Sequence, residues 1–178
     1  LAERGPFYSK MLAGICPDFA GTVVVPPGET VDHRLEVDLG NRLLRITAWP
    51  TAHTNTDLTV FDVKTGTLWS GDLVFAERLP TLDGSILGWL QVLDELLPED
   101  VVRVIPGHGP VSDGRAALAA ERRYLETLRD AVRRAIREGL DIPATLARIG
   151  SDNPQHWQVF EHNHGRNIVS AYTELEWE

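Results

Sequence analysis

The chain lacks several features that would assign it to a specialised class of protein. It has one cysteine, Cys16, which cannot form a disulfide within the chain. No apolar run approaches the roughly 20 residues that a helix needs to span a bilayer. Acidic residues outnumber basic ones, and a formal net charge of −9 without a basic stripe argues against a nucleic-acid partner.

The remaining composition and patterning are those of a globular α/β protein. With 178 residues, 43% hydrophobic and 24% charged, the chain can bury one core, and we expect a single domain over 1–178. Runs of strand-forming residues predict strands at 22–25, 43–49, 58–62, 67–69 and 101–105. Apolar residues at helical spacing predict helices over 1–12, 85–97, 115–138, 143–149 and 167–177. Strands followed by mixed strands and helices predict a layered α/β sheet.

Three short segments each place a potential metal ligand after a run of strand-forming residues. His53 lies in Ala-His-Thr, Asp72 in Ser-Gly-Asp and His108 in Pro-Gly-His-Gly. Because a sheet holds the ends of its strands rigidly, residues that are distant in sequence can converge there. Two imidazoles and a carboxylate suit zinc, or a similar ion such as iron or manganese. We therefore expect the three side chains at one sheet edge, within roughly 8 Å of one another.

The order of these motifs resembles the second half of the metallo-β-lactamase superfamily. The sequence around them is similar to a bacterial branch, the zinc metallohydrolases associated with quinoprotein and sulfur-oxidation systems. In this resemblance, which covers 1–178, His53 matches the third metal-ligating histidine and His108 the last one. Asp72 matches the aspartate that bridges two metals, a catalytic role. The resemblance implies part of an αββα layered fold, with a mixed sheet and flanking helices.

One departure from the superfamily is the absence of its His-x-His-x-Asp-His signature. In the family this segment lies upstream and supplies most of the ligands of a dinuclear site. The chain also begins without an initiator Met, so we expect it to be N-terminally truncated. It would then be the C-terminal portion of the domain, and inactive by itself.

The resemblance implies a zinc-dependent hydrolase that acts on a small-molecule substrate. The full-length parent would hold one or two zinc ions, with iron or manganese also possible, and the site in this chain would be incomplete. Two alternatives stay open, an iron-dependent redox enzyme of the same superfamily and a non-catalytic fragment or interaction module. Expected partners are a second copy or the missing N-terminal segment, and the resemblance favours the bacterial periplasm.

Other residues have simpler interpretations than a site. A second group of potential ligands near the C-terminus consists of His156, Glu161, His162 and His164. It permits a second metal site, but we favour the interpretation that these are loop and helix-start residues in contact with solvent. Asp57, four residues after His53, is expected to orient Thr54 or the local backbone. The tryptophans expected in the core are Trp49, Trp69 and Trp89.

Overall fold

The computed structural model describes residues 5–97 and 99–178, and the chain divides after Asp32 into two compact units. In the first unit, helix α1 (Gly5–Ile15) precedes a short 3-10 helix, η1 (Pro17–Phe19). The helix predicted over 1–12 is therefore present, although residues 1–4 lie outside the described residues. The strand predicted at 22–25 is wrong. These residues have no strand partner, and the prolines that follow them cannot donate backbone hydrogen bonds.

The second unit is built on a mixed sheet whose strands lie in sequence order. They are β1 (Arg34–Asp38), β2 (Leu43–Ala48), β3 (Leu58–Asp62), β4 (Thr67–Phe75), β5 (Arg103–His108) and β6 (Ser112–Asp113). β4 and β5 are parallel, and all other neighbouring strands are antiparallel. The predicted mixed sheet is confirmed. The crossover between β4 and β5 passes through helix α2 (Ile86–Leu96), as a parallel pair requires.

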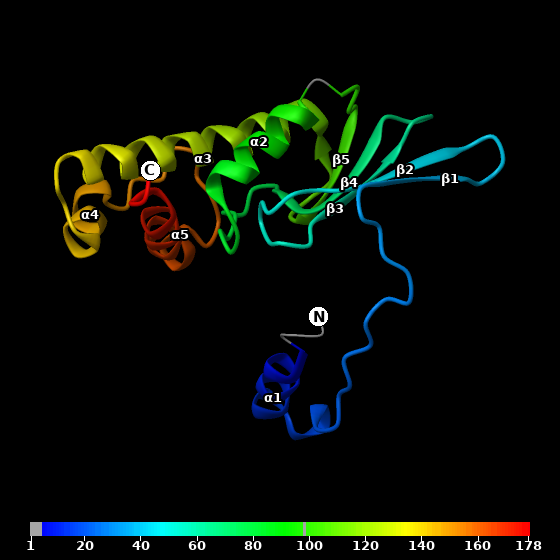
Figure 1. The fold of residues 1–178 in the computed structure, drawn as a ribbon, viewed down its shortest axis with the longest axis horizontal. Coiled ribbons are helices and arrows are strands. Elements are labelled where there is room, and N and C mark those ends of the chain that lie inside the picture. The colour runs from blue at the N-terminus through cyan, green and yellow to red at the C-terminus, as the bar shows by residue number, and fades with distance from the viewer. Residues whose placement is uncertain (1–4, 98) are drawn as a thin grey trace. The chain divides into compact units, whose positions relative to one another are not determined.

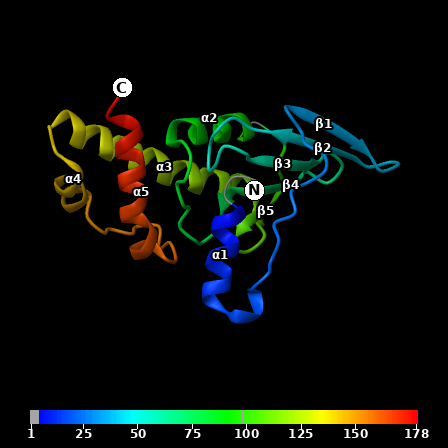
Figure 2. The same ribbon diagram turned by 60° about the horizontal axis from the view of Figure 1, so that its bottom comes forward.

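Helices cover one face of this sheet and extend beyond it. The long helix α3 (Gly114–Arg137) follows the sheet, and α4 (Ile142–Ile149) and α5 (Phe160–Leu175) pack against its far half (Figures 1 and 2). The side chains of Ser85, Asp113 and Asp141 cap α2, α3 and α4 by accepting hydrogen bonds from backbone N–H groups. No helix in the described part of the chain is long and apolar enough to cross a membrane.

The two sheet faces differ in how well they are covered. Leu68 and Val104 point toward α2 and α3 and are almost completely buried, together with Trp89. On the opposite face the register aligns one residue from each of five strands, and we call this line the apolar row: Leu35, Ile46, Val60, Trp69 and Ile105. Trp69 is 36% exposed, so the prediction that it lies in the core is wrong. Side chains alternate along a strand, and Trp69 follows the buried Leu68.

Candidate metal centre

His108 and Asp72 meet at the edge of the sheet where the parallel strands β4 and β5 end. His108 is the last residue of β5, and its Nε2 lies 3.7 Å from Oδ1 of Asp72. Asp72 lies within β4 rather than after it, at a register shift between Gly71 and Phe75. A bulge of this kind redirects a side chain without ending the strand. Both side chains are about half exposed, at 46% for His108 and 40% for Asp72.

The glycines on both sides of His108 allow β5 to approach β4 this closely. A Cβ on Gly107 would lie 1.9 Å from Oδ1 of Asp72, and a Cβ on Gly109 would lie 1.9 Å from the carbonyl oxygen of Ala76. Gly109 also has a φ of +97°, a conformation that favours glycine. In return, the N–H of Ala76 donates to the carbonyl of His108 over 2.9 Å. The two glycines of the Gly-His-Gly motif are therefore sterically required for His108 to lie this close to Asp72.

His53 lies in the loop between β2 and β3 and is almost fully buried. Its ring meets Trp89 edge-on, with 5.4 Å between the ring centroids. Its Nδ1 lies 3.7 Å from Oδ1 of Asp57. Asp57 also accepts hydrogen bonds from the backbone N–H and the hydroxyl of Thr54, at 2.8 and 2.7 Å, which confirms that it orients Thr54. Burial by itself raises the pKa of Asp57, but His53 and the Thr54 hydrogen bonds outweigh it and lower the pKa.

The ring of Phe75 joins the two histidines. His108 stacks on it, with 4.9 Å between centroids and 19° between the planes, and His53 lies against it at 5.8 Å. The structure thus pairs His108 with Asp72 and places His53 on the same aromatic ring. Among the described residues, no group of three or more His, Cys, Asp or Glu side chains is close enough to hold a metal ion. Joint coordination by His53, Asp72 and His108 stays a prediction.

Residues 2–108 match the sequence profile of the metallo-beta-lactamase superfamily. This range covers more than half of the chain and includes His53, Asp72 and His108. The chain belongs to this superfamily. Its members are generally metal-dependent hydrolases and often bind zinc. No curated protein is significantly similar to the chain.

Solved structures of the metallo-β-lactamase superfamily confirm the fold. A metallo-β-lactamase from Pontibacter korlensis is 22% identical, with a TM-score of 0.51 over 65% of this chain and 54% of its own. A β-lactamase domain protein from Burkholderia ambifaria is 19% identical, with a TM-score of 0.64 over 90% and 49%. A sec-alkylsulfatase from Pseudomonas sp. is 15% identical, with a TM-score of 0.64 over 86% and 27%. The chain spans about half the length of these proteins, or less.

The sequence analysis did not identify Glu121, whose buried carboxyl is hydrogen-bonded to the backbone of Phe75, the residue in contact with both histidines. It lies on α3, fully buried, and its Oε2 accepts a hydrogen bond from the backbone N–H of Phe75 over 3.1 Å. Its Oε1 is buried and has no hydrogen-bond partner among the described residues. Burial raises the pKa of Glu121 well above its ordinary value, and the Phe75 hydrogen bond offsets this only partly. The available signal was its spacing between Leu118 and Leu125, on the apolar stripe of the helix.

The C-terminal histidines do not gather into a second site. His156 and His162 are exposed, as expected for residues in contact with solvent. His164 is partly buried instead. Its ring stacks on Phe160, with 4.3 Å between centroids, and its Nδ1 lies 3.1 Å from the hydroxyl of Tyr124.

Proposed function

We propose that this protein is a zinc-dependent hydrolase of small molecules in which Asp72 and His108 bind the metal. The observation that carries the proposal is the 3.7 Å approach of His108 Nε2 to Asp72 Oδ1 at a sheet edge. It occurs in a chain that belongs to a superfamily of mostly metal-dependent hydrolases. Asp72 is the residue proposed to be catalytic, because the superfamily resemblance gives it the position between two metals.

The pair suits a shared metal ion in both geometry and chemistry. Two protein ligands with zinc bonds of about 2.0–2.2 Å lie about 3–4 Å apart, which includes the separation in this protein. An imidazole nitrogen and a carboxylate oxygen are also ordinary ligands of zinc, iron and manganese. Since both side chains are partly exposed, further coordination positions are open to water, substrate or other protein groups.

His53 is the third proposed ligand, through its Nε2 atom. A metal-ligating histidine usually presents its other ring nitrogen to a carboxylate, which fixes the tautomer and the ring orientation. Asp57 lies 3.7 Å from Nδ1 of His53 and is itself held by Thr54, so this supporting arrangement is present. The ring is further held by Trp89 and Phe75. Nε2 is then the nitrogen left for a metal.

The chain's own residues would prepare the site for hydrolysis. A bound zinc ion supplies a water nucleophile that is active near neutral pH and polarises the bond to be cleaved. Asp72 contributes a negative charge that offsets part of the charge of the metal. The Phe75 ring covers one side of the His108 imidazole, which limits its rotation and shields it from water. Three ligands from this chain fall short of a complete dinuclear site, so the remainder would come from water or another protein segment.

Zinc binding tests this proposal directly, independently of any substrate. Titration of the purified protein against a coloured zinc chelator should show binding that His108→Ala or Asp72→Asn weakens by about tenfold or more. His162→Ala, which removes an exposed histidine far along the sequence, is the matched control and should change nothing. Zinc affinity that is unchanged in both His108→Ala and Asp72→Asn would overturn the assignment.

Metal analysis and the same chelator titration separate this function from its alternatives. Metal analysis of the protein as purified distinguishes zinc from iron, because stoichiometric iron would favour redox chemistry on the same ligands. A non-catalytic interaction module is a second candidate, and the half-exposed apolar row favours it. That role predicts a folded protein without measurable zinc binding, which the chelator titration would reveal.

A further inference from the structure

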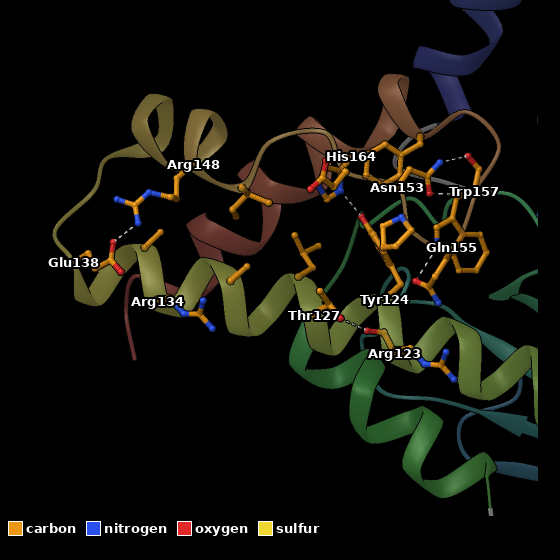
Figure 3. A pocket seen from close by; sticks show the side chains of 17 residues that line it. Arg123, Tyr124, Thr127, Arg134, Glu138, Arg148, Asn153, Gln155, Trp157 and His164 are labelled. Carbon is orange, nitrogen blue, oxygen red and sulfur yellow. Dashed lines mark hydrogen bonds and ion pairs between the residues drawn. The ribbon is translucent and has the colours of Figure 1, made fainter.

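A cavity of about 560 Å³ lies between α3, α4, α5 and the segment 152–157. None of His53, Asp72 and His108 lines it, so it is separate from the proposed metal centre. Its volume falls within the range of about 300–1,000 Å³ that is usual for small-molecule sites. Figure 3 shows the lining side chains, with the Glu138–Arg148 ion pair at one end and Gln155 and Trp157 at the other.

The wall of the cavity is mostly apolar and aromatic. Tyr124 and Leu128 from α3, Trp157 from the preceding segment and Phe160 from α5 are all buried and line it. The floor on α3 includes the small residue Ala131, which leaves the space that a larger side chain would fill. Flat aromatic walls around an unfilled volume favour a ligand with a flat apolar body.

One polar side chain of the lining, His164, is held in place by a chain of hydrogen bonds. The N–H of Leu82 donates to Oδ1 of Asn167, which fixes the amide so that its Nδ2 donates to the Tyr124 hydroxyl over 2.9 Å. Tyr124 must then donate its own proton to Nδ1 of His164, 3.1 Å away. The remaining ring proton of His164 is on Nε2, and burial lowers the pKa of His164, so the ring is neutral at neutral pH. His164 therefore offers a hydrogen-bond donor to a ligand in the cavity.

Positive charge at the cavity contrasts with the acidic chain as a whole. Arg123 and Arg134 lie along its α3 side, both exposed, and no ion pair among the described residues includes either (Figure 3). Arg148 is paired with Glu138, and Asp152 is the other carboxylate in the lining. Three arginines against two carboxylates leave a positive balance in a chain whose formal net charge is −9. A ligand with a negative group complements it.

We propose that this cavity binds a small molecule with a flat apolar body and one anionic group, a carboxylate or a sulfonate. The apolar body lies against Tyr124, Trp157 and Phe160, where it removes apolar surface from water. The anionic group pairs with Arg123 or with Arg134, which lie about 16 Å apart along α3 and therefore cannot both reach one small group. The site is independent of the proposed metal centre and does not require zinc.

A pair of fluorescent dyes that differ in charge tests both parts of the proposal. The probes are 8-anilinonaphthalene-1-sulfonate, which is anionic, and N-phenyl-1-naphthylamine, which is neutral and otherwise similar. The wild-type chain should bind both, and Ala131→Phe should abolish both because it fills the cavity. The double variant Arg123→Gln/Arg134→Gln should weaken the sulfonate by roughly fivefold and leave the neutral dye unchanged.

Comparison with a control variant shows whether the dyes bind in the cavity or on another surface. Trp69→Ser removes an exposed aromatic from the apolar row, which is another surface where the dyes could bind, and it should leave both dyes bound. Dye binding that Trp69→Ser abolishes and Ala131→Phe leaves intact would overturn the cavity site. Equal weakening of both dyes by the double arginine variant would overturn the anionic ligand. If Ala131→Phe does not fold, the arginine variant still tests the proposal, because its substitutions are exposed and should not disturb the core.

Discussion

Replacing Glu121 with glutamine should make the stability of this protein less dependent on pH. Glu121 is fully buried, and burial raises the pKa of its carboxyl well above the ordinary value of 4.5. The folded protein therefore keeps this proton at a pH where the unfolded chain has released it. Its contribution to stability is complete below the ordinary pKa and is lost as the pH rises toward the raised one.

The magnitude follows from proton linkage and from the hydrogen bonds of Glu121. Within this pH window, each unit of pH lowers the free energy of unfolding by about 1.4 kcal/mol through this one group. Glutamine has nearly the same shape, does not titrate, and retains an oxygen that can accept from the N–H of Phe75. Glu121→Met removes that acceptor and should be about 1–3 kcal/mol less stable than Glu121→Gln at every pH, because a buried N–H loses its partner and neither side chain titrates.

Urea denaturation followed by tryptophan fluorescence, at several values from about pH 5 to about pH 8, measures these differences. The stability of Glu121→Gln relative to wild type should rise with pH above the ordinary pKa of Glu121 and become constant once the pH exceeds the raised pKa. Glu126→Gln is the control for loss of one negative charge, because Glu126 lies on the same helix in an ion pair with Arg122. A constant difference between wild type and Glu121→Gln at all pH values would refute the reasoning.

Three further predictions concern the metal centre and the apolar row. Gly107→Ala should weaken zinc binding by about tenfold or more in the chelator titration, because its Cβ would lie 1.9 Å from Asp72 Oδ1 and displace the carboxylate. Asp57→Ala should cost about 1 kcal/mol or more in urea denaturation, because the partly buried N–H of Thr54 loses its acceptor. The lowered pKa of Asp57 makes this stability present above its ordinary value of 3.8 and lost as the pH falls further. Trp69→Ser should reduce self-association in sedimentation velocity, because it interrupts the apolar row.

Matched controls identify which contact is responsible in each case. Gly28→Ala adds the same methyl group where no atom lies within 4 Å, and should leave zinc binding unchanged. Trp177→Ser removes another exposed tryptophan, outside the apolar row, and should leave self-association unchanged. Equal effects of a test variant and its control would contradict the proposed mechanism. For Asp57→Ala, unfolding that is identical to wild type would do so.

Much of the secondary structure could be predicted from local sequence patterns. The helix predicted over 115–138 is α3 (Gly114–Arg137), and the short helix predicted over 143–149 is α4, which Asp141 caps. Both have apolar residues at helical spacing and a clear end signal, so the prediction needs only neighbouring residues. The helix predicted over 167–177 begins earlier, at Phe160, where the ring of His164 stacks on Phe160 and lies against Tyr124.

Contacts between distant segments account for the wrong predictions. The segment 22–25 has the residues of a strand, but a strand exists only where a partner offers backbone hydrogen bonds. Trp69 is a typical core residue by type, and its exposure depends on which sheet face the helices cover. Asp72 was expected after a strand, whereas the register of β4 against β5 keeps it within one.

The sequence by itself determined the superfamily, the α/β class and the identity of the proposed ligands, because these depend on motifs and on local periodicity. Only the tertiary structure decided that His108 lies beside Asp72 while His53 shares the Phe75 ring, since that requires the parallel pairing of β4 and β5. It likewise decided the burial of Glu121 and the cavity beside α3. Both arise from how helices separated in sequence pack together, and the apolar stripe that includes Glu121 indicates only which face of α3 is buried, not what covers it.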